Sequence, residues 1–137
     1  MTAGVPHDRT GTSKTLGYTL DTSDAAGRVT VSMDVTDDHT NRHGNLHGGL
    51  IATVLDTAMG ATASFTRGDG GRIPYATISL TVNFIAPMPK GTITATGRVL
   101  GGGFKTVFLE GHAHDANGAL IAQATGTFKR TPLGTSA

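Results

Sequence analysis

Residues 48–65, GGLIATVLDTAMGATASF, decide which fold this chain can adopt. The stretch contains no proline, is rich in alanine, and is apolar on most sides when wound as a helix. It therefore predicts one long, buried helix, with glycines on both flanks at Gly44 and Gly68. A helix that is apolar nearly all round needs cover nearly all round, and a curved antiparallel sheet would supply that cover.

The segments on both sides of this helix carry strand signals. Apolar and polar residues alternate strictly over 28–36 before the helix and over 77–84 after it, a pattern typical of half-buried strands. Further strands are predicted over 16–22, 92–100, 104–112 and 119–129, with turns at 101–103 and 115–118. Because short turns imply antiparallel pairing, the sequence predicts an α+β fold: a six-stranded antiparallel sheet wrapped around one long central helix.

The length of 137 residues fits a single domain, expected over 15–131, with a flexible N-terminal tail at 1–14 and a C-terminal tail at 132–137. The absence of cysteine excludes disulfides, a thiol nucleophile and cysteine-ligated metals. Residues 1–14 hold no apolar run of the signal-peptide kind, and no stretch is apolar for long enough to cross a membrane. We therefore expect a cytoplasmic protein.

The charge of the chain is balanced and low. A net charge of +1 gives no reason to expect binding to nucleic acid or to an anionic membrane surface. Charged residues make up only 15% of the chain, against about 25% in an average soluble domain. Since a small domain normally needs charge to cover its surface, the low content indicates that another copy of the chain covers part of it.

Asp56 is the only charged residue between His47 and Arg67, and it lies in the middle of the predicted helix. Aspartate is a poor helix former there and gains nothing from the helix dipole. At helical spacing it belongs to a narrow stripe of small or polar side chains, formed by Gly49, Thr53, Asp56, Gly60 and Ala63. Such a stripe lets a second backbone or a ligand approach closely, so a functional carboxylate is favoured over a purely structural one.

The residues that open the helix form a second candidate element. Gly48 and Gly49 follow His47 at the helix N-terminus, where the first N–H groups have no partner within the helix. Together with the helix dipole, these donors suit a developing oxyanion, and glycine lets a substrate carbonyl come close. Taken alone, the same residues would also fit an ordinary glycine-rich entry to a helix.

Two stretches of the sequence together resemble one known family. Residues 41–49, NRHGNLHGG, followed by Asp56, resemble the signature of the hotdog-fold thioesterase superfamily, and within it the PaaI-like, phenylacetate-pathway branch of acyl-CoA thioesterases. Residues 77–87, TISLTVNFIAP, are similar to the strand after the helix in that family. The resemblance implies a hotdog fold and hydrolysis of an acyl- or aryl-CoA to free acid and coenzyme A. It also implies no cofactor, and a homodimer or homotetramer with active sites at the subunit interface.

The resemblance further implies roles for individual residues. Asp56 corresponds to the catalytic carboxylate, as general base or as nucleophile, and the N–H of Gly48 corresponds to the oxyanion donor, with His47 beside it. Asn41 matches the residue that places the water or the thioester. Thr77 matches a hydroxyl near the carboxylate, a role for which Ser79 is an alternative. Substrate contacts are expected at Gly49, Arg98 and Lys105, with Arg67 as a further candidate for phosphate, while coenzyme A and acyl carrier protein both stay open as the carrier.

Other interpretations stay open beside this one. His39, His43 and His47 recur at four-residue spacing and would suit metal ligation on a continuous helix. Gly44 interrupts any helix there, so no metal is expected. A non-catalytic acyl-CoA-binding hotdog domain would not need Asp56. A hotdog-fold enoyl-thioester hydratase, which usually has a catalytic histidine ahead of the helix, is kept open by His47.

Overall fold

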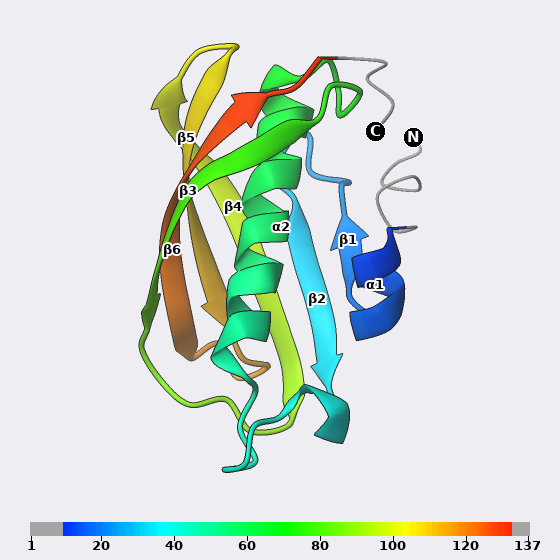
Figure 1. Ribbon diagram of the computed structural model, residues 1–137, viewed down its shortest axis with the longest axis vertical. Helices are drawn as coiled ribbons and strands as arrows, with labels where there is room; N and C mark the ends of the chain where they lie inside the picture. Colours follow the sequence, from blue (N-terminus) through cyan, green and yellow to red (C-terminus); the bar gives the residue numbers. More distant parts are fainter. Residues whose placement is uncertain (1–9, 133–137) are drawn as a thin grey trace.

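The computed structural model describes residues 10–132, which form a six-stranded antiparallel sheet with one long helix against it (Figure 1). The strand order across the sheet is β1-β2-β4-β5-β6-β3. In chain order the elements are α1 (Gly11–Leu16), β1 (Thr19–Asp21), β2 (Thr30–Val35), the 3-10 helix η2 (Asp37–His39), α2 (Gly48–Arg67), β3 (Tyr75–Phe84), β4 (Gly91–Gly102), β5 (Thr106–His114) and β6 (Leu120–Arg130). The predicted order of two strands, one long helix and four strands is confirmed.

The N-terminal segment differs from the sequence prediction. Gly11–Leu16 forms helix α1, where the sequence predicts a flexible tail through residue 14. Thr10 caps this helix by accepting a hydrogen bond from the Ser13 N–H, and Gly17 ends it in the left-handed conformation with φ 82°. Residues 1–9 and 133–137, which carry most of the two predicted tails, lie outside the described residues, so the domain limits stay a prediction.

The core lies between α2 and the inner face of the sheet, where Leu55 and Ala58 are fully buried. The two layers come closest at Gly97 in β4. A Cβ at this position would stand 2.7 Å from the Ala58 carbonyl oxygen and 2.7 Å from Thr62 Oγ1, so only glycine fits. Thr62 Oγ1 also accepts a hydrogen bond from the Val29 N–H over 2.9 Å, which fixes α2 to the segment that enters β2.

The sheet covers α2 on one side, not on nearly all sides as the sequence suggested. Asp56 and Thr57 keep intermediate exposure on the face turned away from the sheet. Ala63, which helical spacing places in the same stripe as Asp56, is instead fully buried. Ala63 belongs to the main apolar core. The loop from α2 to β3 is held to the end of the helix by a hydrogen bond that Ser64 Oγ donates to Ile73 O over 2.6 Å.

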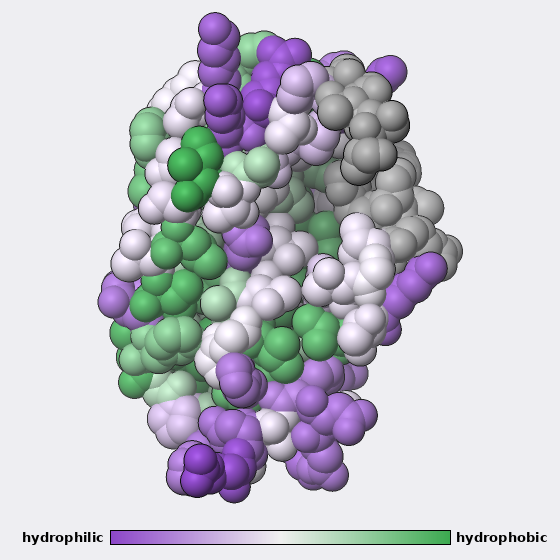
Figure 2. Space-filling view, in the orientation of Figure 1, coloured by the Kyte–Doolittle hydropathy of each residue, from purple (hydrophilic) through white to green (hydrophobic). Residues whose placement is uncertain are grey.

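The two edge strands of the sheet differ greatly in length. β1 has three residues, whereas β3 has ten and, within residues 10–132, pairs with β6 on one side only. Large apolar side chains are exposed along β3 and just after it: Ile78 by 58%, Phe84 by 57% and Ile85 by 53%. Figure 2 shows apolar surface along the flank of the molecule where β3 runs. A long unpaired edge with apolar side chains is a surface that proteins usually cover.

Candidate active site

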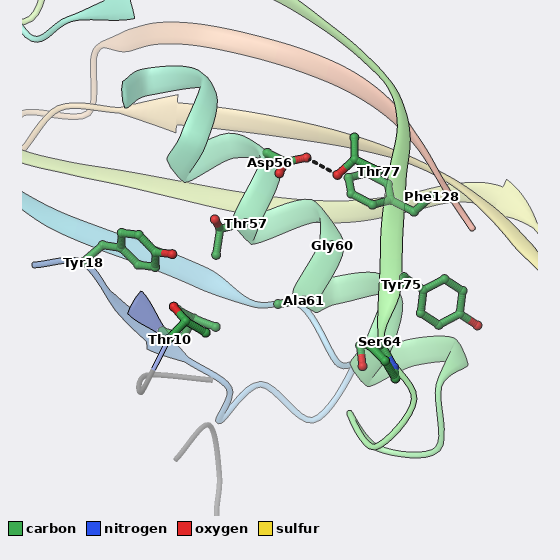
Figure 3. Close-up of a pocket in the computed structure, with 12 residues that line it drawn as sticks. Thr10, Tyr18, Asp56, Thr57, Gly60, Ala61, Ser64, Tyr75, Thr77 and Phe128 are labelled. Atoms are coloured by element: carbon green, nitrogen blue, oxygen red, sulfur yellow. Dashed lines mark hydrogen bonds between the residues drawn. The ribbon is translucent and has the colours of Figure 1, made fainter. Parts of the chain in front are cut away.

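Asp56 lies in the middle of α2 on the open face, and its carboxylate meets a hydroxyl from β3. Thr77 Oγ1 donates a hydrogen bond to Asp56 Oδ1 over 2.6 Å (Figure 3). Asp56 Oδ2 has no hydrogen-bond partner among the described residues. The contact therefore fixes one carboxylate oxygen and leaves the other available to water or to a substrate.

A β-bulge turns Thr77 toward the helix. Strict alternation would place Thr77 on the same face as Ser79, away from α2. The pairing of β3 with β6 shifts between these two residues, so that Thr77 pairs with Phe128 and Leu80 with Gly126. Phe128 and Gly126 are both buried on the inner face, so Thr77 and Leu80 share that face although they are three positions apart. The bulge makes Thr77, and not Ser79, the hydroxyl that reaches the carboxylate.

A hollow with a volume of about 230 Å³, called the Asp56 pocket below, opens beside this pair (Figure 3). Small residues of α2, Gly60 and Ala61, leave the space for it. The other walls come from the segment around α1 and β1, from the start of β3 and from β6. The lining residues are Thr10, Tyr18, Leu20, Asp56, Thr57, Gly60, Ala61, Ser64, Pro74, Tyr75, Thr77 and Phe128.

Tyr75 connects the Asp56 pocket to the β4–β5 hairpin. Its hydroxyl donates a hydrogen bond to Phe104 O over 2.6 Å. Burial raises the pKa of Tyr75 above its ordinary value, and the positive charges of Arg130 and Arg67 partly oppose that rise. The Arg130 guanidinium also lies 3.7 Å from the centroid of the Phe104 ring. The exposed side chain of Lys105, a predicted substrate contact, follows directly in this hairpin.

The N-terminus of α2 presents one free backbone donor. His47 caps the helix, because its Nδ1 accepts a hydrogen bond from the Gly49 N–H over 2.9 Å. Neutral His47 therefore carries its proton on Nε2. The Gly49 donor, expected to contact substrate, is used by this cap, whereas the Gly48 N–H has no hydrogen-bond partner among the described residues. Gly48 also lies against the Phe84 ring, which a Cβ at this position would approach to 3.3 Å.

Asn41 lies beside Gly48 in a tight turn. Its Oδ1 accepts hydrogen bonds from the N–H groups of His43, over 2.9 Å, and Asn45, over 3.3 Å. These two donors assign the amide oxygen, so Nδ2 is the side-chain group that can donate to a ligand. Asn41 and Gly48 line one hollow, together with Phe84. The structure thus brings Asn41 and Gly48 to one hollow, while the roles that the resemblance implies for them stay a prediction.

The residues predicted to act together occupy two separate places in one chain. Asp56 and Thr77 form one group, which we call the carboxylate half-site, and Gly48 and Asn41 form the other, the amide half-site. Asp56 lies eight positions after Gly48 in one continuous helix. At a rise of 1.5 Å per residue, this places the two residues about 12 Å apart along the helix. The two half-sites of one chain do not face a common point.

Arg98, another predicted substrate contact, lies apart from both half-sites. It forms an ion pair with Glu110 on the neighbouring strand. With Arg28 and Arg67, Arg98 lines a different hollow at the C-terminal end of α2. The structure therefore does not bring Arg98 or Arg67 to the Asp56 pocket.

The rings of His39 and His47, two of the three histidines ahead of α2, make local structural contacts. His39 Nδ1 accepts a hydrogen bond from the Thr36 N–H over 3.0 Å, and its Nε2 lies 2.8 Å from Leu16 O. One neutral tautomer, protonated on Nε2, satisfies both contacts. Within residues 10–132, no group of three or more histidine, aspartate or glutamate side chains is placed to hold a metal ion. None of the helices described over the same range has the length and apolar character needed to cross a membrane.

The N-terminal wall of the Asp56 pocket is the part of the site that the sequence pattern does not predict. Tyr18 and Thr10 belong to it, and both lie in or next to the segment expected as a tail or a weak strand. Thr10 and Gly17, a helix cap at each end, are the signals that would have indicated α1. No local signal points to Tyr18 as a pocket residue, because its position depends on how β1 packs beside α2.

Comparison with known proteins gives a family and a set of similar structures. The family model of the thioesterase superfamily matches residues 43–122. The E. coli PaaI protein from the phenylacetic acid degradation operon is similar at 24% identity and a TM-score of 0.82, over 93% of this chain and 89% of that one. A thioesterase family protein from Silicibacter pomeroyi is similar at 27% identity and a TM-score of 0.83, over 94% of each chain.

A hypothetical thioesterase from Streptococcus pneumoniae, solved with coenzyme A, is similar at 21% identity and a TM-score of 0.72, over 86% of this chain and 88% of that one. No curated protein sequence matches the chain significantly. At these identities the likeness to the PaaI and S. pneumoniae structures shows a shared fold. Together with the sheet order and the single long helix, it confirms the predicted hotdog fold.

Proposed function

This chain belongs to the thioesterase superfamily, and from that premise we propose that it hydrolyses the thioester of an acyl- or aryl-coenzyme A to the free acid and coenzyme A. The observation that carries the proposal is the carboxylate half-site: Asp56 on an open helix face, held by Thr77 over 2.6 Å and lining a pocket. The relative from S. pneumoniae solved with coenzyme A supports this carrier over an acyl carrier protein.

Asp56 would supply the attack on the thioester carbon by one of two routes. In the first, Oδ2 takes a proton from a water molecule while the water oxygen attacks the carbonyl carbon, and the thiolate leaves and is protonated. In the second, Oδ2 attacks the carbon directly, the thiolate leaves, and water then hydrolyses the mixed anhydride. Thr77 holds Oδ1 in both routes. Transfer of ¹⁸O from water into Asp56 during a single turnover would identify the second route.

The amide half-site would stabilise the oxyanion that forms in either route. The Gly48 N–H is free of partners among the described residues and lies at the positive end of the dipole of α2. Such a fixed donor does not have to reorganise as negative charge develops on the carbonyl oxygen. Asn41 Nδ2 is a second donor in the same hollow. His47 assists by capping the Gly49 N–H, which keeps the first turn of the helix in place.

A second copy of the chain is part of the proposal. A reacting carbonyl must lie about 3–3.5 Å from its nucleophile, so two half-sites about 12 Å apart in one chain cannot serve the same carbonyl. We therefore propose a homodimer or homotetramer in which the carboxylate half-site of one chain faces the amide half-site of another. The long unpaired edge of β3, with Ile78 and Phe84 exposed, supports a contact between two copies there.

The first test follows thiol release from purified protein and its Asp56→Asn variant. The substrates are phenylacetyl-, hydroxybenzoyl-, short-chain and long-chain acyl-CoAs. We expect hydrolysis of at least one class, and its loss in a folded, still oligomeric variant. Equal rates in the two proteins would remove Asp56 from the mechanism. Hydration of an enoyl-CoA without thiol release would favour a hydratase instead, and binding without any turnover would favour an acyl-binding domain.

The oxyanion donor can be tested by Gly48→Pro beside Gly48→Ala. Proline is well tolerated at the first position of a helix, and His47, at φ −59° and ψ 132°, already has the extended conformation that a following proline requires. Proline deletes the N–H, whereas alanine keeps it and adds the same Cβ against Phe84. We expect hydrolysis to fall much further in the proline variant. Equal losses of activity in the two variants would show that crowding against Phe84 is the cause, and that the Gly48 N–H has no role in catalysis.

Sharing of the site between chains can be tested by mixing two inactive variants. In a hybrid dimer of Gly48→Pro and Asp56→Asn chains, one of the two sites has both defects and the other has none. Random exchange of subunits should therefore restore about a quarter of the original activity. Two variants that stay inactive after verified subunit exchange would contradict a site built from two chains.

A further inference from the structure

The hydroxyl groups that line the Asp56 pocket differ in whether they have a partner. Six residues with hydroxyl side chains line it: Thr10, Tyr18, Thr57, Ser64, Tyr75 and Thr77. Four of them are engaged. Thr10 caps α1, Ser64 donates to Ile73 O, Tyr75 donates to Phe104 O, and Thr77 donates to Asp56. Tyr18 and Thr57 have no hydrogen-bond partner among the described residues.

Tyr18 stands out because it is also buried. Only 5% of the residue is exposed, and its ring belongs to the main apolar core. Figure 3 shows the side chain pointing from the β1 side toward the face of α2 that carries Thr57, with the hydroxyl foremost. The hydroxyl therefore opens into the Asp56 pocket and not to the outer surface of the molecule. Thr57 is half-buried on the adjacent helix turn.

The Tyr18 oxygen is not sealed in the core, because Thr22 Oγ1 is the only side-chain nitrogen or oxygen among the described residues that is buried without a hydrogen-bond partner. Phenylalanine would fill the same core position but would present no polar atom to the pocket. A tyrosine whose ring is packed, and whose oxygen is directed into a pocket, is instead suited to bind a polar group that enters the pocket. The phenol can donate or accept, so the group can be a hydroxyl, an amine or a carbonyl.

We propose that Tyr18, assisted by Thr57, recognises a hydrogen-bonding substituent on a short acyl group, and so determines which thioesters the protein prefers. This inference rests on the proposed hydrolysis of acyl-CoA. It assigns to the acyl group the space between the carboxylate half-site on one side and the two free hydroxyls on the other.

The size of the Asp56 pocket supports this assignment. Its volume of about 230 Å³ is below the roughly 300–1,000 Å³ of pockets that hold whole drug-sized ligands. The pocket can therefore hold only part of an acyl-CoA. Asp56 lines the pocket and must reach the thioester carbon, and coenzyme A is far larger than this volume, so we assign the pocket to the acyl side of that carbon. A long alkyl chain would meet the wall formed by Tyr18 and Leu20.

The test compares acyl-CoAs that differ by one hydroxyl: butanoyl- with 3-hydroxybutanoyl-CoA, and benzoyl-CoA with its three ring-hydroxylated isomers. Dissociation constants are measured by calorimetry on the Asp56→Asn protein, so that no substrate is consumed. We expect at least one hydroxylated member to bind more tightly than its parent. Adding Tyr18→Phe should reduce that preference roughly fivefold to fiftyfold, without weakening the parent compound.

Tyr75→Phe is the matched control. It removes a phenol oxygen from another residue that lines the pocket, but this oxygen points away from the pocket and donates to Phe104 O, so the preference for the hydroxylated member should persist. Equal affinity for every pair, or a preference that survives Tyr18→Phe, would overturn the role of Tyr18 and leave the proposed hydrolysis intact. Failure of every acyl-CoA to bind would overturn the proposed function, and this inference with it.

Discussion

The two faces of α2 carry out different tasks with neighbouring residues of one helix. Leu55 and Ala58 face the sheet and are fully buried. Asp56 and Thr57 face away from it, half-exposed, beside a pocket that Gly60 helps to form. The side chains of the inner face are apolar and tightly packed against the sheet. Those of the outer face are small or polar and leave room for a ligand. The comparison teaches that fold stability and chemistry should respond to substitutions at adjacent positions independently.

The largest effect is expected for Asp56→Asn on the outer face. Loss of the carboxylate should lower kcat by about 10² to 10⁴-fold, the range typical of a removed general base. Asparagine can still accept from Thr77, so the free energy of unfolding should change by about 0.5 kcal/mol or less. Steady-state kinetics and urea denaturation of the same preparation check both numbers. A loss of activity that only follows a loss of folded protein would contradict the separation of chemistry and stability between the two faces.

Leu55→Ala should have the opposite profile from the inner face. Truncating a fully buried leucine should lower the free energy of unfolding by about 2–5 kcal/mol, because it loses burial and leaves a cavity. The kcat per folded molecule should stay close to that of the original protein. Denaturation gives the first value, and kinetics at a temperature where the variant is folded gives the second. A selective fall in kcat would show that the inner face also sets the position of Asp56.

Gly97→Ala tests how closely the inner face packs against the sheet. The added Cβ would stand 2.7 Å from the Ala58 carbonyl oxygen, so we expect a loss of about 1–3 kcal/mol in the free energy of unfolding. Gly101→Ala, on the same strand but with no atom within 4 Å of the new Cβ, is the control and should be nearly neutral. Thermal or urea unfolding of the two variants measures this difference in stability. Equal stability of the two variants would mean that the layers can separate without cost.

Thr77→Val should have a smaller effect, confined to the outer face. Losing the hydrogen bond to Asp56 Oδ1 should lower kcat/KM about tenfold, since a hydrogen bond to a charged group typically contributes about 1.5 kcal/mol or more. Thr77→Ser should retain most of the activity. Ser79→Ala removes a hydroxyl that the bulge leaves on the other side of β3, so its kcat/KM should not change. A larger effect from Ser79 than from Thr77 would contradict this assignment of the hydroxyl.

The smallest effect concerns how the stability of the protein depends on pH at Tyr75, which lines the Asp56 pocket. Burial raises the pKa of Tyr75, so folding disfavours its ionised form. The stability that neutral Tyr75 contributes should be fully present below the ordinary tyrosine pKa and should be lost as pH rises through the raised value. The urea midpoint of the original protein should therefore exceed that of Tyr75→Phe at neutral pH, and the difference should shrink at strongly alkaline pH. A difference that stays constant across this range would exclude ionisation of Tyr75 as the cause.

The inner face and the strands could be predicted from sequence because their signals are local and repeated. The apolar run over 48–65 predicts α2, and strict alternation predicts β2 and most of β3 within a few residues of their ends. Asp56 could be singled out for the same reason, since a lone charge in an apolar helix is a local anomaly. Gly48 followed from its place at the helix start.

The outer face could be predicted only in part, because it depends on contacts between distant segments. The alternation over 77–84 has no visible break, so nothing in the pattern reveals the bulge that turns Thr77 inward. Ala63 is buried in the main apolar core, although helical spacing alone places it in the same stripe as Asp56. Tyr18 is an ordinary strand-like residue until β1 is placed beside α2.

The bulge in β3 has a consequence for how relatives are aligned. Ile78 is an extra residue in β3, with no partner in β6. In a sequence alignment, the residues of β3 before Ile78 are therefore displaced by one column relative to a strand without the bulge. A relative that lacks this insertion would present its inward hydroxyl one position nearer to the residue matching Leu80. Aligned without a gap, that hydroxyl would fall in the column of Ile78, and Thr77 would seem to have no counterpart. In this family the hydroxyl should be matched by its contact with the helix carboxylate, and an insertion or deletion in this strand should be counted as a change to the active site.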